Sequence, residues 1–208
     1  EYDGRVGVFS WLSHEVSTRS GDGSRPVICL MDGEHKLWAR KRELLPDNVV
    51  EVLDLWHVMD RLWDVASALH GADNTASREF VSDRLRQILE GKVGRVIGGL
   101  RQTLTKRKLS KATAETIAST ITYFSNNQDR MRYDVCLREG YPIASGVIEG
   151  ACRHVVGDRL DRTGTRWTVD GAVSMLATRT TYLSDDWNDY QQFRISREQT
   201  TIHPTTNI

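Results

Sequence analysis

Two acidic residues of the chain stand where carboxylates commonly do chemistry. Asp32 directly follows a continuous apolar run, Val-Ile-Cys-Leu-Met at residues 27–31, which is the pattern of a buried β-strand. Ligands of open α/β sheets bind just past the carboxyl end of such a strand. Glu149 lies in the first turn of a predicted helix, close to Gly146 and Gly150, and arginines follow it along that helix. Metal-binding carboxylates beside a path for a polyanion suggest phosphodiester chemistry on DNA.

Each carboxylate also has a simpler explanation. Asp32 and the glycine after it form a strong turn signal in their own right. Glu149 is stabilised by the dipole of its helix whatever its function, and Ser145 or Gly146 is expected to cap that helix. Taken alone, neither residue decides between structure and chemistry.

A second signal is Asp-Leu-Trp-His at residues 54–57, at the junction of a predicted strand and a predicted helix. Asp54 and His57 could pair with each other, bind a metal ion or contact phosphate. The alternative is a helix-capping aspartate with a histidine in the first turn, and the spacing alone favours that alternative.

Four arginines and a tryptophan make up a candidate DNA-binding region. The guanidinium group suits phosphate because its planar fork donates two parallel hydrogen bonds. Asp158 and Asp161 lie among these arginines, so a solvated helix face of mixed charge is the alternative. Trp167 is expected either to stack on an unpaired base or to pack its loop against the core. The arginines are Arg153, Arg159, Arg162 and Arg166.

The overall charge gives no general argument for nucleic acid. Lys+Arg and Asp+Glu both number 28, so the formal net charge is zero. Any such argument depends on local charge. Basic residues are concentrated between Arg95 and Lys111, where no acidic residue occurs.

Cysteine usage and hydropathy indicate a reducing compartment. The three cysteines, Cys29, Cys136 and Cys152, are widely spaced and form no CxxC pair. This pattern argues against disulfides and structural zinc and favours the cytosol. No apolar run approaches the length of a membrane span, so a cytoplasmic protein without a membrane partner is expected.

The elements that must position these residues begin with an α/β region. Residues 5–12 are predicted to form a short strand, and residues 27–31 and 49–53 two more, with a helix at 34–45 between the last two. Two strands joined by a helix form a βαβ unit, so the N-terminal quarter of the chain is predicted to be α/β.

From Trp56 onward the apolar period becomes helical. Helices are also predicted at residues 145–160 and 169–183, followed by a loose polar tail after Asn188. The intervening helices are expected at roughly 56–69, 75–90, 93–107, 112–126 and 127–138.

Several longer motifs follow one another between residues 25 and 195. They are Leu-Met-Asp-Gly at 30–33, Val-Leu-Asp-Leu-Trp-His-Val at 52–58 followed by Leu62-Trp63, Tyr-Phe-Ser-Asn-Asn at 123–127, Arg-Met-Arg-Tyr at 130–133, Pro-Ile-Ala-Ser-Gly-Val-Ile-Glu-Gly-Ala-Cys-Arg-His at 142–154, and Gly-Thr-Arg-Trp at 164–167. In this order they resemble bacterial insertion-sequence transposases of the DDE class, most closely the Kra type.

The resemblance implies an α/β fold that is part of a ribonuclease-H-like core with a long all-helical insertion. Residues 1–58 would form a partial ribonuclease-H-like sheet region and residues 59–140 the helical insertion. Residues 141–187 would supply the returning catalytic helix and a C-terminal helix, and residues 188–208 the tail.

The resemblance also implies the roles of the candidate residues. Asp32 would be the second acid and Glu149 the third acid of a catalytic triad that binds Mg²⁺ or Mn²⁺, with Asp54 and His57 supporting the site. Asp3 lies too close to Asp32 to leave room for the strands expected between the first two acids. The first acid is therefore expected upstream of residue 1.

The implied function is that of the C-terminal catalytic portion of a DNA transposase. It would carry out metal-dependent DNA strand cleavage and strand transfer at insertion-sequence ends, with transposon ends and target DNA as partners and a homo-oligomer as the active complex, in the cytoplasm at the nucleoid. A catalytically inactive DNA-binding remnant is the main alternative, and a stand-alone ribonuclease-H-like nuclease is a third possibility.

Overall fold

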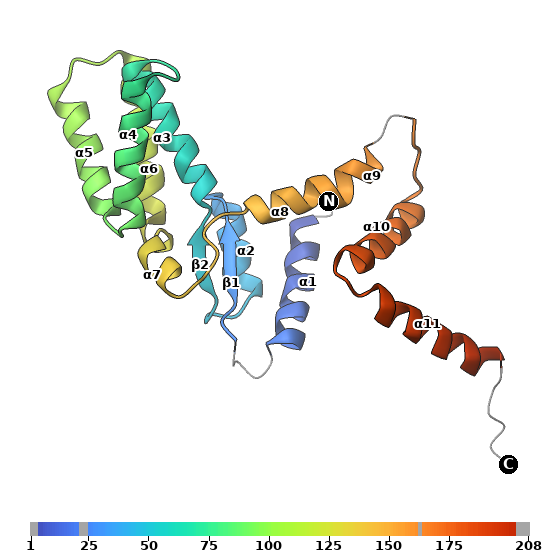
Figure 1. Cartoon of the computed structure of the whole chain (residues 1–208). Helices are drawn as coiled ribbons and strands as arrows, with labels where there is room; N and C mark the ends of the chain where they lie inside the picture. Colours follow the sequence, from blue (N-terminus) through green and yellow to red (C-terminus); the bar gives the residue numbers. More distant parts are fainter. Residues whose placement is uncertain (1–3, 21–24, 162–163, 203–208) are drawn as a thin grey trace. The chain divides into compact units, whose positions relative to one another are not determined.

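The computed structural model describes residues 4–20, 25–161 and 164–202. The chain divides into two compact units, Glu1–Ser145 and Gly146–Ile208. The first unit contains the sheet, and the described elements of the second unit are helices (Figure 1). The division into four regions that the resemblance implies remains a prediction.

The first unit is built on one βαβ unit. Strand β1 (Ile28–Met31) and strand β2 (Val50–Leu53) pair in parallel, and helix α2 (His35–Leu44) connects them. The apolar runs therefore predicted these two strands and their connection correctly. Because the strands are parallel, their carboxyl ends meet at one edge of the sheet, which is where Asp32 and Asp54 follow them.

The predicted fold class is nevertheless wrong. Helices make up 74% of the structure and strands 4%, and the described residues hold one sheet of two strands rather than a ribonuclease-H-like core. The strand predicted at residues 5–12 lies inside helix α1 (Gly4–Arg19). Val6 and Val8 suggested a strand by their alternation, but both are exposed, and Phe9 is the buried residue of this helix. The sheet buries its apolar faces against helices, not against further strands.

Both faces of β1 are covered, as its uninterrupted apolar sequence predicted. Ile28 and Leu30 pack against the main apolar cluster, which the helical block supplies. Cys29 and Met31 pack against a second cluster that contains Phe9 of α1. The sheet is thus a layer between α1 and α2 on one side and the helical block on the other.

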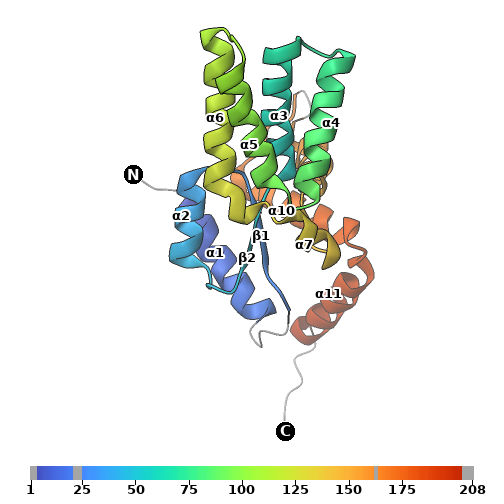
Figure 2. The same cartoon turned by 90° about the vertical axis from the view of Figure 1, so that its left-hand side faces the viewer.

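Four long helices form a block that begins where β2 ends (Figures 1 and 2). Three of them start at capping side chains: Asp54, Asn74 and Ser110 each accept a hydrogen bond from a backbone N–H of the first turn. The predicted helices are confirmed here to within a few residues, except that the last one divides into a short 3₁₀ turn and a separate helix. The elements are α3 (Leu55–His70), α4 (Thr75–Leu89), α5 (Val93–Lys106), α6 (Lys111–Asn127), η1 (Gln128–Arg130) and α7 (Tyr133–Arg138).

The second unit has no buried residue in its described part. Its first helical run covers the predicted range and contains a π-helical segment in the middle. The loose tail predicted after residue 188 is wrong, because α11 occupies most of it. The elements are α8 (Gly146–Ala151), η2 (Cys152–Gly157), α9 (Asp158–Leu160), α10 (Val169–Leu183) and α11 (Trp187–Ile202). Across the described residues of both units, no helix combines the length and hydropathy needed to cross a membrane.

Candidate functional site

Asp32 lies at the carboxyl end of β1 in a turn that fixes its side chain. Its Oδ1 accepts a hydrogen bond from the Glu34 backbone N–H at 2.8 Å, and its backbone oxygen accepts one from Trp38 Nε1 at 2.7 Å. Both donors come from the start of α2. The predicted turn is therefore present, and the hydrogen bond to Oδ1 orients the carboxylate. The other oxygen, Oδ2, has no hydrogen-bond partner among the described residues, so it remains able to bind a ligand.

The residue after Asp32 packs directly against α6. A Cβ placed on Gly33 would lie 2.3 Å from Tyr123 Cε2, so only glycine fits at this position without a shift of the ring. The Arg61 guanidinium lies 5.0 Å from the centroid of the same ring. Tyr123 therefore holds the Asp32 turn against the helical block.

The hydroxyl group of Tyr123 is buried and has no hydrogen-bond partner within the part of the chain that the structure describes. Burial raises the pKa of Tyr123, and the backbone of Gly33 and the charge of Arg61 offset this only in part. A buried hydroxyl without a partner is unfavourable, and such groups occur where a ligand or water completes the bonding.

Asp32 and Tyr123 face an open pocket of about 540 Å³, the Asp32 pocket. His57, for which the resemblance implies a supporting role, also lines this pocket. Three more residues of α3 that line the pocket, Asp60, Arg61 and Asp64, had no role assigned from the sequence. Together with His57 they have the spacing of residues on one face of a helix. The lining is formed by Asp32, Gly33, Glu34, His57, Asp60, Arg61, Asp64 and Tyr123.

Asp54 does not line this pocket but links two distant parts of the chain. It is buried and caps α3 by accepting a hydrogen bond from the Trp56 backbone N–H at 3.1 Å. Its carboxylate also accepts hydrogen bonds from the backbone N–H of Ser145, at 3.2 Å, and from the Ser145 hydroxyl. Asp54 therefore caps the helix, as the spacing favoured, and also holds Ser145, directly before the helix that carries Glu149.

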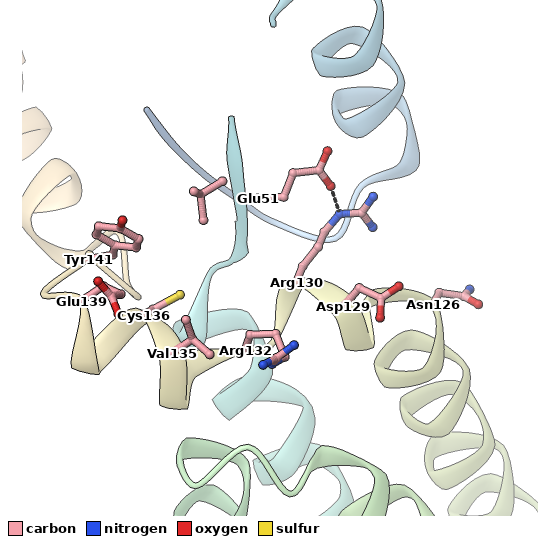
Figure 3. A pocket seen from close by; sticks show the side chains of 10 residues that line it. Glu51, Asn126, Asp129, Arg130, Arg132, Val135, Cys136, Glu139 and Tyr141 are labelled. Carbon is pink, nitrogen blue, oxygen red and sulfur yellow. Dashed lines mark hydrogen bonds and ion pairs between the residues drawn. The ribbon is translucent and has the colours of Figure 1, made fainter. Parts of the chain in front are cut away.

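The motif at residues 130–133 also holds β2 in place. The Tyr133 hydroxyl donates to the Leu53 backbone oxygen at 2.7 Å. Arg130 Nε lies 2.6 Å from Glu51 Oε2, at a separate pocket of about 610 Å³ (Figure 3). The buried Lys41 ammonium lies 3.2 Å from the other oxygen of Glu51. Burial would raise the pKa of Glu51, but the hydrogen bonds from Arg130 and Lys41 hold it below its ordinary value.

Glu149 lies in the first turn of α8, as predicted, and is exposed. The residues that follow it form the π-helical segment η2, and π-helical segments are frequent at functional sites. The Arg179 guanidinium donates to the His154 backbone oxygen at 2.7 Å, which ties η2 to α10. Within the second unit, Glu149 thus begins an irregular helix that is braced by its neighbour.

The predicted DNA-binding residues of the second unit differ in exposure. Arg153, Arg159 and Arg166 are exposed, whereas Arg162 lies outside the described residues. Trp167 is half-buried, and its indole Nε1 is buried without a hydrogen-bond partner in the described chain. This burial favours packing over base stacking for Trp167, while the three exposed arginines remain accessible to phosphate.

The predicted metal site needs residues of both units. Asp32 belongs to the first unit and Glu149 to the second. Within residues 4–20, 25–161 and 164–202, no group of three or more His, Cys, Asp or Glu side chains is arranged to hold a metal ion. Among the described residues, neither unit by itself supplies such a group.

Searches of protein-family models, curated proteins and solved structures found no match to this chain.

Proposed function

We propose that this chain is the C-terminal catalytic portion of a DDE-type DNA transposase, which cleaves DNA strands at insertion-sequence ends and transfers them to target DNA. The observation that carries the proposal is the convergence of the motifs in space. Asp54 of one motif bonds to Ser145 of another, 91 positions later. Gly33 of the first motif packs against Tyr123 of a third. If each motif only stabilised its own helix, contacts between the motifs at one edge of the sheet would not be expected.

In this proposal the two acids have different supports. Asp32 is oriented by its turn and opens into the Asp32 pocket. Glu149 follows the Ser145 segment, whose position Asp54 sets. We propose that both bind Mg²⁺ or Mn²⁺ in the assembled complex, because carboxylates are the usual protein ligands of these ions. His57 and Asp54 support the site.

DNA is held by groups outside the Asp32 pocket. Arg153, Arg159, Arg162 and Arg166 contact phosphate, and Trp167 packs the loop between them and α10. A homo-oligomer is the expected active form.

The test is strand cleavage by the protein as its gene encodes it, including any residues before Glu1. The substrate is a labelled DNA duplex carrying the end of the insertion sequence, with Mg²⁺ or Mn²⁺ added. Asp32→Asn is expected to suppress cleavage by about 100-fold or more, since a missing metal ligand removes transition-state stabilisation. Binding of the duplex is expected to persist. Unchanged cleavage in this variant would remove Asp32 from the proposed site.

The second candidate function is a DNA-binding remnant without catalytic activity. The exposed arginines Arg153, Arg159 and Arg166 favour it, since guanidinium groups suit phosphate without any catalytic group beside them. Its expected behaviour is binding of the duplex without cleavage at any divalent-ion concentration. Mg²⁺-dependent cleavage would exclude the remnant.

A further inference from the structure

The basic residues of the chain are concentrated in one segment of the helical block. Between Glu90 and Glu115 there are seven lysines and arginines and no aspartate or glutamate, although the net charge of the whole chain is zero. The segment covers α5 and the connection from α5 to α6. This separation of charge creates a local positive potential that the overall composition conceals.

The fold places these cations on a solvent-facing surface. The apolar side of α5 is buried in the block through Val93, Val96, Ile97 and Leu100, with the spacing of an amphipathic helix. Helix α5 lies at the outer side of the block, and its connection to α6 lies at the end farthest from the sheet (Figures 1 and 2). The α5 surface, as we define it, consists of the exposed residues Arg95, Arg101, Lys106, Arg107 and Lys108.

The α5 surface has no counter-charges of its own. Lys92, at the start of the segment, pairs with Glu90 at 2.6 Å, and Lys111, at its end, lies 3.9 Å from Glu115. None of the five cations of the α5 surface forms an ion pair within the described residues. Lys106, Arg107 and Lys108 are consecutive, so their charges repel one another, and a polyanion would relieve that repulsion.

Two glycines give the same helix a smooth exterior. A Cβ on Gly98 or on Gly99 would meet nothing within 4 Å, so packing within the chain does not require glycine at either position. Glycine in a helix interior is unfavourable compared with alanine. Glycine has no side chain, so it allows close approach of a partner's backbone. Such an approach would explain the two glycines beside the cations.

We propose that the α5 surface binds the phosphate backbone of double-stranded DNA, as a contact separate from the arginines of the second unit. The choice of DNA among polyanions rests on the proposed function. The contact is independent of base sequence, because arginine and lysine on phosphate position a duplex without reading it. The α5 surface would therefore hold DNA that flanks the cleaved position.

The test compares two triple variants of the whole chain that remove the same charge. Arg101→Gln, Lys106→Gln and Lys108→Gln together alter the α5 surface. Lys36→Gln, Arg42→Gln and Arg138→Gln alter exposed cations elsewhere in the first unit and serve as the matched control. Binding of a duplex of random sequence is measured over a series of salt concentrations, and circular dichroism checks that both variants remain folded.

The α5 variant is expected to reduce the slope of log affinity against log salt by about 2.7, since each lost phosphate contact accounts for about 0.9. Binding should weaken by roughly 10- to 100-fold at about 0.15 M salt. The slope of the control variant should differ from that of the unaltered chain by less than about 0.9, the value of one phosphate contact. Equal slopes in the two variants would overturn the proposal, as would binding of anionic lipid vesicles in place of DNA.

The result separates this contact from the proposed function. If the α5 variant shows a reduced salt slope but the unaltered protein never cleaves DNA, DNA binding by the α5 surface is supported and the transposase function is refuted. If the unaltered protein cleaves DNA but the α5 variant binds like its control, the transposase function is supported and DNA binding by the α5 surface is refuted.

Discussion

The carboxylate of Asp54 accepts two hydrogen bonds from Ser145, one from the backbone N–H at 3.2 Å and one from the hydroxyl. The same carboxylate caps α3 through the Trp56 backbone N–H. One buried side chain thus fixes the start of α3 and the residue that precedes α8. The Asp-x-x-His motif therefore has a structural explanation here: its aspartate connects elements, and its histidine lines the Asp32 pocket.

Asp54→Ala is expected to destabilise the protein by about 2–4 kcal/mol, because it removes a helix cap and leaves the Ser145 groups without their acceptor. Ser145→Ala removes only the hydroxyl and should cost about 1 kcal/mol. Denaturant unfolding measures both. Asp60→Ala, on the exposed side of the same helix, is the control. If Asp54→Ala cost no more than Asp60→Ala, the connection would have no energetic importance.

Gly33→Ala is expected to destabilise the protein by about 1–3 kcal/mol, because the added methyl group meets the Tyr123 ring. Gly98→Ala is the matched control. It should be neutral or stabilising by about 0.5–1 kcal/mol, since its methyl group meets open space. Tyr123→Leu removes the atoms nearest to the new methyl group. The double variant Gly33→Ala, Tyr123→Leu should therefore be more stable than the two single changes predict together. Strictly additive effects would contradict the contact.

The amino-acid sequence predicted most of the first unit because its signals there are local. The apolar run before Asp32 and the helical period after Trp56 gave the βαβ unit and the helical block. Val6 and Val8 misled because alternation over a few residues also occurs on the exposed side of a helix. The tail was misjudged because α11 has little apolar periodicity.

Parts of the candidate site could not be predicted from local sequence patterns. Asp60, Arg61 and Asp64 could have been found from their helical spacing relative to His57. The contact of Tyr123 with Gly33 could not, because nothing near either residue specifies a partner about 90 positions away. The expected ribonuclease-H-like sheet failed for a similar reason: a resemblance between motifs carries no information on the strands around them.

The three cysteines are expected to react with thiol reagents at different rates. Cys152 is exposed, Cys29 is partly buried and Cys136 is buried. Burial raises the pKa of Cys29 from 9.0 to about 11, with Lys41 offsetting part of the effect, and burial also raises the pKa of Cys136. Iodoacetamide at pH 8 should therefore label Cys152 first, as mass spectrometry would show, because the thiolate is the reactive form. Faster labelling of Cys29 than of Cys152 would contradict its burial.

The raised pKa of Cys29 also predicts how stability depends on pH. The folded protein favours the protonated thiol, so this contribution is fully present below pH 9.0 and is lost as the pH rises toward about 11. Unfolding measured across this range should show a smaller decrease in Cys29→Ala than in the unaltered protein. An identical decrease in both would mean that Cys29 ionises equally in the folded and unfolded chains.

Arg166→Ala is expected to weaken DNA binding to a similar extent for all sequences, because a phosphate contact carries no base information. The slope of log affinity against log salt should fall by about 0.9. Titrations with two unrelated duplexes over several salt concentrations measure both effects. Arg194 is exposed and pairs with Glu198 in α11, so Arg194→Ala is a suitable control. A salt slope unchanged by Arg166→Ala would make this arginine purely structural.

The most direct measurement of the proposed function is cleavage of an insertion-sequence end by the protein as its gene encodes it, compared with Glu149→Gln. This change keeps the size of the side chain and removes the charge that, in the proposed site, would bind a divalent ion. Cleavage should fall by about 100- to 1,000-fold, while binding of the duplex is unchanged. Glu79→Gln, an exposed glutamate of α4, should cleave normally. Full cleavage by Glu149→Gln would remove Glu149 from the catalytic set, and no cleavage by the unaltered protein with Mg²⁺ or Mn²⁺ would contradict the transposase.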